Sequence, residues 1–99
     1  THKDSDQIAD AQYWLGRVYF AQKKFEEAAI ALAEFNSVFP NDPRFQEATL
    51  LIAESAVNFA PKDQLCDILK QSLEFMVNPS DKFVKRINLL KNKKQCTTG

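Results

Sequence analysis

Two apolar helical patterns lie between Asp10 and Pro40, on either side of the polar stretch Gln22-Lys23-Lys24. Small residues stand where two such helices would cross, with Gly16 in the first pattern and Ala28 in the second. The distance between packed helices depends on the side chains at their contact, so these residues favour close packing. Pro40 lacks a backbone N–H and is expected to end the second helix. The stretch therefore predicts a helical hairpin.

The spacing within this hairpin matches the tetratricopeptide repeat, a helix–turn–helix unit of about 34 residues. When Ala9 is taken as the first position, the signature positions hold Leu15, Gly16, Tyr19, Phe25, Ala28 and Pro40. Gln12, Leu32 and Phe35 depart from the usual residues at their positions. We expect Leu15 and Tyr19 to fill the space between the two helices. An ordinary helical bundle is the alternative, although it gives no reason for this spacing, and the pattern predicts an all-α tetratricopeptide-repeat superhelix.

The rest of the chain extends this pattern to five helices in one domain, residues 1–99. We predict them at about residues 5–22, 25–38, 43–58, 62–77 and 80–95, forming repeat one (9–42), repeat two (43–79) and a C-terminal capping helix (80–95). Ser5 or Asp6, Asp42 and Ser80 are the predicted N-caps of the first, third and fifth helices, with Pro43 at the first helical position of the third. The first helix is apolar on two sides, which suggests a missing neighbour and a domain excised from a longer chain.

Composition argues against catalysis. The single histidine is His2 in a polar N-terminal stretch, and two glycines are too few for a phosphate-binding loop. We therefore expect no catalytic residues, metal site or cofactor, and an enzyme subunit would be recognised only through its partner. Thirteen basic and thirteen acidic residues balance, so no global charge attracts nucleic acid or anionic lipid. No apolar run approaches the roughly 20 residues that span a bilayer, so we expect no membrane insertion.

Cys66 and Cys96 are the two cysteines. If the last two predicted helices are antiparallel, both thiols come to the same end of the pair, and a frayed tail after the fifth helix can close the remaining gap. A disulfide would place the protein in an oxidising compartment. The alternative is two free thiols in a cytosolic protein.

Four runs of the sequence carry a more specific resemblance: DAQYWLG at 10–16, YFA at 19–21, FEEAA at 25–29 and FPNDP at 39–43. They resemble the C-terminal repeat domain of the Tol-Pal-associated cell division coordinators, the YbgF/CpoB family of Gram-negative bacteria. Alphaproteobacterial members are similar also in having cysteines at places matching Cys66 and Cys96. The second repeat departs from the family, with Ile52-Ala53 where Leu-Gly is usual.

The resemblance implies a periplasmic adaptor with a cleaved signal sequence. Such an adaptor contacts TolA and, in some bacteria, a peptidoglycan synthase, and it coordinates outer-membrane constriction with wall synthesis during cell division. A generic adaptor or oligomerisation module of another envelope or cytosolic assembly is the alternative. A chaperone-docking repeat is a further rival, but the Lys and Asn of its carboxylate clamp are replaced here by Tyr13 and Arg17.

The repeat pattern also predicts the partner-binding residues, on a concave face made by the first helix of each hairpin. They are Asp10, Tyr13, Arg17, Phe20, Glu47, Leu50 and Glu54. Aromatic and charged groups together suit a helix or an extended peptide. We expect alanine at Tyr13 or Arg17 to weaken partner binding without unfolding the domain. The alternative is that these residues are ordinary surface, or contacts to a missing repeat.

The second apolar face of the first helix, with Ile8, Trp14 and Val18, predicts self-association. Burial of two or three such side chains contributes roughly 4 to 8 kcal/mol before the costs of association. We expect a dimer or larger assembly, with exchange of segments at the turns as one route. Sedimentation over about a hundredfold range of concentration tests this, because a dimer dissociates on dilution. A monomer throughout, with the Trp14 fluorescence of a buried ring, would contradict the prediction.

Overall fold

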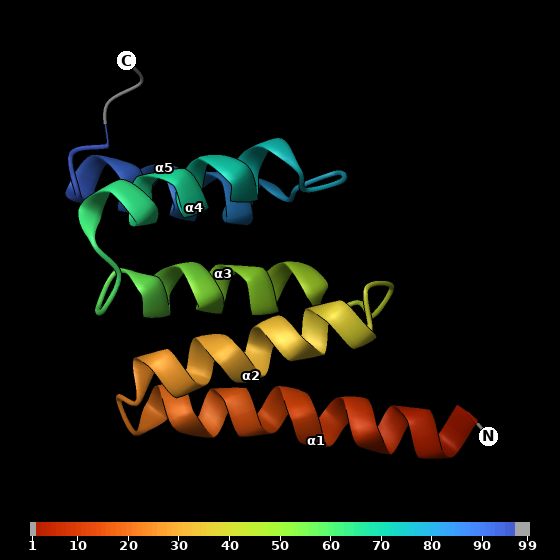
Figure 1. Cartoon of the computed structure of the whole chain (residues 1–99). Helices are drawn as coiled ribbons and strands as arrows, with labels where there is room; N and C mark the ends of the chain where they lie inside the picture. Colours follow the sequence, from red (N-terminus) through yellow and green to blue (C-terminus); the bar gives the residue numbers. More distant parts are fainter. Residues whose placement is uncertain (1, 97–99) are drawn as a thin grey trace.

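The computed structural model describes the backbone of residues 2–96 and the side chains of residues 7–96. Within this part the chain forms five α-helices and no strand, which confirms the all-α prediction. They are α1 (His2–Ala21), α2 (Phe25–Val38), α3 (Phe45–Ala56), α4 (Lys62–Glu74) and α5 (Asp81–Lys93). Consecutive helices run in opposite directions and stack in an elongated body of 47 × 30 × 18 Å (Figure 1). In addition, α1 contacts α3, and α3 contacts α5.

Several predicted helix ends are wrong. The first helix begins at His2, upstream of the predicted caps Ser5 and Asp6, whose side chains lie outside the described part. The fourth ends at Glu74 rather than near residue 77, and the chain turns at Asn78 with a φ of 51°. The fifth agrees with its predicted cap, because Ser80 Oγ accepts a hydrogen bond from Phe83 N at 3.1 Å.

The third helix begins at Phe45, two residues later than predicted, and Asp42 does not cap it. The Asp42 carboxylate instead accepts a hydrogen bond from Arg44 N at 2.9 Å, within the turn that precedes the helix. The same carboxylate binds the Arg44 guanidinium. An ion pair and a turn therefore use the oxygens that would otherwise have capped α3.

Two hydrophobic cores share α3. The first joins α1, α2 and α3 through Ala9, Tyr13, Leu32, Phe35 and Ala48. The second joins α3, α4 and α5 through Leu50, Ala53, Ala56, Leu65, Leu69, Phe83, Ile87 and Leu90. Because α3 carries small residues towards both sides, it can be buried between its neighbours without separating them.

The contact between α1 and α2 depends on Gly16. A Cβ atom at this position would lie 2.5 Å from Leu32 Cγ and 2.6 Å from Leu32 Cδ2, and Leu32 is fully buried. Nearby, Gln12 Nε2 donates to the carbonyl of Ala31 at 2.9 Å and joins the same two helices. The prediction that Leu15 fills the space between these helices is wrong, because Leu15 is 44% exposed. Leu32 occupies that space instead.

The disulfide between Cys66 and Cys96 confirms the predicted pairing, with the two Cα atoms 5.4 Å apart. The sequence predicts a frayed tail after α5, but a C-terminal helix cap positions Cys96 instead. Gln95 adopts a left-handed φ of 58°, Gln95 N donates to Asn92 O, and Cys96 N donates to Lys91 O at 2.8 Å. This pair of bonds is a Schellman motif, which turns the chain back at the end of α5 towards α4. Cys66 and Cys96 are 30 residues apart in the sequence. A disulfide that closes a loop of this length stabilises a fold by on the order of 3 to 4 kcal/mol.

The close approach at Gly16 predicts the effect of a single methyl group. Gly16→Ala should destabilise the fold by about 1 to 3 kcal/mol through overpacking, although alanine is the better helix former. Urea denaturation measures the change. In a Leu32→Ala background the clash is absent, and Gly16→Ala should become neutral or stabilising. An equal loss in both backgrounds would show that Leu32 is not the obstacle.

Candidate functional site

The predicted partner-binding residues come from α1 and α3, and the fold brings these two helices together. An ion pair joins Arg17 Nη1 to Glu47 Oε1 at 3.6 Å, and both side chains remain largely exposed. Phe20 is half-buried, and its ring packs edge-on against Phe25 with ring centres 5.5 Å apart. Glu54 accepts a hydrogen bond from Arg86 of α5 at 2.7 Å. The candidate surface therefore extends from α1 across α3 to α5.

Tyr13 lies inside the fold, which corrects the prediction, and Leu50 is largely buried as well. Tyr13 is 2% exposed and Leu50 is 9% exposed, so each belongs to a hydrophobic core. Alanine at Tyr13 should therefore cost several kcal/mol of stability, contrary to our expectation that it would leave the domain folded. Asp10 is exposed, but an ion pair with Arg44 at 2.7 Å already engages it.

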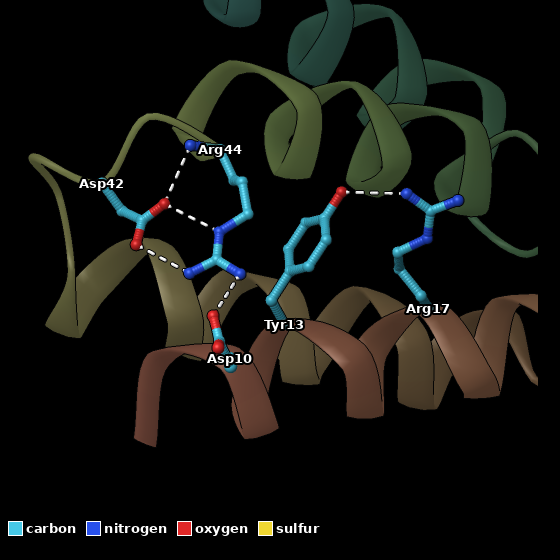
Figure 2. Close-up of polar contacts among 5 residues, drawn as sticks. All are labelled: Asp10, Tyr13, Arg17, Asp42 and Arg44. Atoms are coloured by element: carbon cyan, nitrogen blue, oxygen red, sulfur yellow. Dashed lines mark hydrogen bonds and ion pairs between the residues drawn. The ribbon is translucent and has the colours of Figure 1, made fainter. Parts of the chain in front are cut away.

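Arg44 is the residue that the sequence did not single out. Its guanidinium donates to both oxygens of Asp42 at 2.9 Å and to Asp10 Oδ1 at 2.7 Å. It also lies over the Tyr13 ring, 5.1 Å from the ring centre, in a cation–π arrangement. We call Arg44 with its two aspartates the arginine clamp. It ties the turn before α3 to α1, over the buried face of Tyr13 (Figure 2).

Tyr13 is held between two guanidinium groups. Its hydroxyl accepts a hydrogen bond from Arg17 Nη1 at 3.1 Å, and Arg44 covers the ring on the other side (Figure 2). Burial raises the pKa of the Tyr13 phenol, and the bond from Arg17 opposes this rise only in part. The phenol thus stays neutral at physiological pH, and its oxygen accepts the bond from Arg17.

The hydrogen bond from Arg44 holds the pKa of Asp42 below its usual range. The same bond raises the pKa of Arg44, so this pair is fully charged near neutral pH. A sequence signal for the clamp does exist in Asp42-Pro43-Arg44, since a turn brings residues two apart together. Its link to Asp10, 34 residues away, depends on how α1 and α3 pack.

The main hollow of this surface lies between α3 and α5 and has a volume of about 720 Å³. Leu50, Leu51 and Leu89 contribute its apolar part, with Leu89 53% exposed. Charged residues line its two sides: Glu47 and Glu54 on α3, and Lys82, Lys85 and Arg86 on α5. The hollow thus combines exposed apolar area with charges of both signs, a combination that also occurs in peptide-binding surfaces.

Two smaller hollows share lining residues with the main one. One, of about 340 Å³, lies beside the start of α5 and is lined by Glu47, Leu50 and Lys82, among others. The other, of about 350 Å³, is lined by Leu51 together with Trp14, Val18 and Phe20 of α1. The three hollows thus form one surface across α1, α3 and α5, which we call the groove. The repeat pattern predicted five of its lining residues but missed Leu51 of α3 and the residues of α5; the five are Arg17, Phe20, Glu47, Leu50 and Glu54.

Clusters of metal-ligating side chains and membrane-spanning helices are both absent from the described part of the chain. Among residues 7–96, no group of three His, Cys, Asp or Glu side chains could hold a metal ion. The same residues include no helix whose length and apolar character suffice for crossing a membrane. Comparison with known proteins adds no family, because no family model, curated protein or solved structure matches the chain.

The arginine clamp predicts a pH-dependent stability. The pKa of Asp42 is lower in the folded state than in the unfolded state, so the clamp stabilises above the unfolded pKa of about 4 and fades as pH falls through the folded value. Asp42→Asn should therefore cost about 1 to 2 kcal/mol at neutral pH and less in acid. Urea denaturation at about pH 7 and about pH 3 measures both differences.

Asp67→Asn on α4 is the matched control, because Asp67 is exposed and takes part in none of the ion pairs found among residues 7–96. It should change stability by less than about 0.5 kcal/mol at either pH. A loss for Asp42→Asn that is the same at both pH values would show that the charge of Asp42 does not hold the clamp.

Proposed function

We propose that this chain is a non-catalytic protein-binding module that takes up a segment of its partner in the groove. The observation that carries the proposal is the combination found there: Leu89 half-exposed in a hollow, with charged side chains on two facing helices. Exposed apolar side chains beside charges are the usual anchors of peptide recognition. The charged residues restrict which segments can bind.

We further propose that the fold is a tetratricopeptide-repeat superhelix of two hairpins and a capping helix. Two observations support this architecture. Consecutive helices alternate in direction (Figure 1), and α1, α3 and α5 contact one another in sequence as the first helices of successive repeats would. The close contact of Gly16 with Leu32 supports it as well, since that glycine is a signature residue of the repeat.

The biological setting that we propose is the periplasmic Tol-Pal system. The module would bind a TolA-like protein or a peptidoglycan synthase and link outer-membrane constriction to wall synthesis during division. The resemblance of residues 10–43 to the coordinator family supports this setting. The disulfide between Cys66 and Cys96 also supports it, because disulfides persist in oxidising compartments.

An oligomerisation module is a second candidate function, favoured by one observation. On α1 the side chains of Ile8, Trp14, Leu15 and Val18 are between 44% and 60% exposed. Ile8, Leu15 and Val18 lie at spacings of seven and three residues, which places them along one side of the helix. A second copy of the chain could cover this stripe while the hollows between α3 and α5 stay open, because Val18 lines only the hollow on α1.

The proposed function predicts that peptides bind the groove. We would select binders from a random displayed peptide library against the whole chain with its disulfide intact, and measure their affinity by fluorescence anisotropy. Leu89→Asp should weaken the selected peptides by at least about tenfold, since it places a charge in the apolar hollow. Ile30→Asp is the matched control, because Ile30 is 56% exposed on α2 and lines none of the three hollows.

Circular dichroism and thermal unfolding establish that both variants fold. Binding that survives Leu89→Asp, or that is lost equally in Ile30→Asp, would contradict the groove as the binding surface. Failure to select any peptide would contradict the proposed function itself.

A further inference from the structure

The charge of the chain is balanced as a whole but not along the groove. Five basic residues and one acidic residue lie in α5 (DKFVKRINLLKNK), and the acidic one, Asp81, lines none of the three hollows. The facing helix α3 contributes Glu47 and Glu54. The groove therefore has a basic side on α5 and an acidic side on α3.

The acidic side is already compensated within the protein. Glu54 accepts from Arg86 Nη2 at 2.7 Å, across the groove. Glu47 Oε1 lies 3.6 Å from Nη1 of Arg17 on α1. Each glutamate thus has a cation beside it, which offsets the negative charge that the acidic side presents to a ligand.

The basic side is not compensated in this way. Among the ion pairs found in residues 7–96, none involves Lys82 or Lys85. Both ammonium groups are exposed and line the main hollow, and Lys82 also lines the hollow beside the start of α5. After internal pairing, the groove therefore presents two positive charges to a ligand.

These charges lie beside the most exposed leucine of the groove. Lys85 and Leu89 are four residues apart on α5, so they occupy adjacent turns of the same helix face. Lys82 precedes Lys85 by three residues on that face. A ligand that covers Leu89 with an apolar side chain would bring its neighbouring residues next to both lysines.

We propose that the groove selects protein segments that carry acidic residues next to an apolar side chain. The apolar side chain would cover Leu89, and the carboxylates would pair with Lys82 and Lys85. This inference rests on the proposed function and adds to it the chemistry of the partner. A protein segment is favoured over nucleic acid because the cations surround an apolar hollow and the whole chain has no net charge.

The test compares three labelled peptides that share one amphipathic leucine-containing sequence. In the first the polar residues flanking the leucines are Glu, in the second Gln, and in the third Lys. Fluorescence anisotropy with the whole oxidised chain should show the Glu peptide bound at least about tenfold tighter than the Gln peptide, and the Lys peptide bound weakest. The preference should shrink as salt is raised, because both lysines are exposed.

Charge reversal in the protein should reverse this order. The double variant Lys82→Glu, Lys85→Glu should bind the Glu peptide at least about tenfold more weakly than the wild type does, and should prefer the Lys peptide. The matched control is Lys62→Glu, Lys70→Glu on α4, which changes the net charge equally but lies outside the hollows. The control should change affinity for the Glu peptide by less than about twofold.

Three results would overturn the inference. One is equal affinity for the Glu and Gln peptides, and another is an equal effect of both double variants. The third is equally tight binding of a single-stranded oligonucleotide of the same charge, which would indicate a general polyanion site. The library selection separates the two proposals: selected peptides that depend on Leu89 but are not acidic would retain the proposed function and refute this inference.

Discussion

The burial of α3 between two hydrophobic cores is the constraint on which the rest of the structure depends. Ala48 faces the core shared with α1 and α2, whereas Leu50, Ala53 and Ala56 face the core shared with α4 and α5. Helices packed on both sides of α3 can approach closely only because most of these residues are small. The groove follows from this arrangement, since α3 lies between α1 and α5 and its remaining face is left open to solvent.

Polar contacts fix the N-terminal end of α3 to the elements on both sides. Arg44, the residue before the helix, binds Asp42 in its own turn and Asp10 on α1. Gln46, in the first turn, donates to the carbonyl of Asn78 and accepts from Ser80 N, both in the connection between α4 and α5. Further along, Glu54 binds Arg86 of α5. The helices that form the groove are thus joined by directional bonds as well as by apolar packing, which gives the groove a defined width.

Part of the candidate site could be predicted from the sequence, and the incorrect predictions have physical reasons. Repeat spacing placed Arg17, Glu47 and Glu54 on the open face, because helical periodicity determines which side of a helix a residue occupies. It could not show that Tyr13 would be buried, since that depends on packing against Phe35 of α2 and Arg44 before α3. Leu32 fills the space predicted for Leu15 because Gly16 admits a large side chain from α2. The α5 residues were missed because periodicity gave α5 only a capping role and did not show which of its side chains face α3.

Sequence by itself determined the all-α class and the order of five helices, and it favoured the pairing of Cys66 with Cys96 that the structure contains. Apolar periodicity, proline and short polar turns are local signals, and the antiparallel arrangement of consecutive helices follows from short connections. Only the tertiary structure decided where several helices end and which cations remain uncompensated in the groove. It also decided that Asp42 binds Arg44 instead of capping α3. Each of these depends on contacts between residues distant in the chain, such as Arg44 with Asp10 and Arg86 with Glu54. A sequence pattern records which groups are present, whereas their pairing is decided when the helices pack.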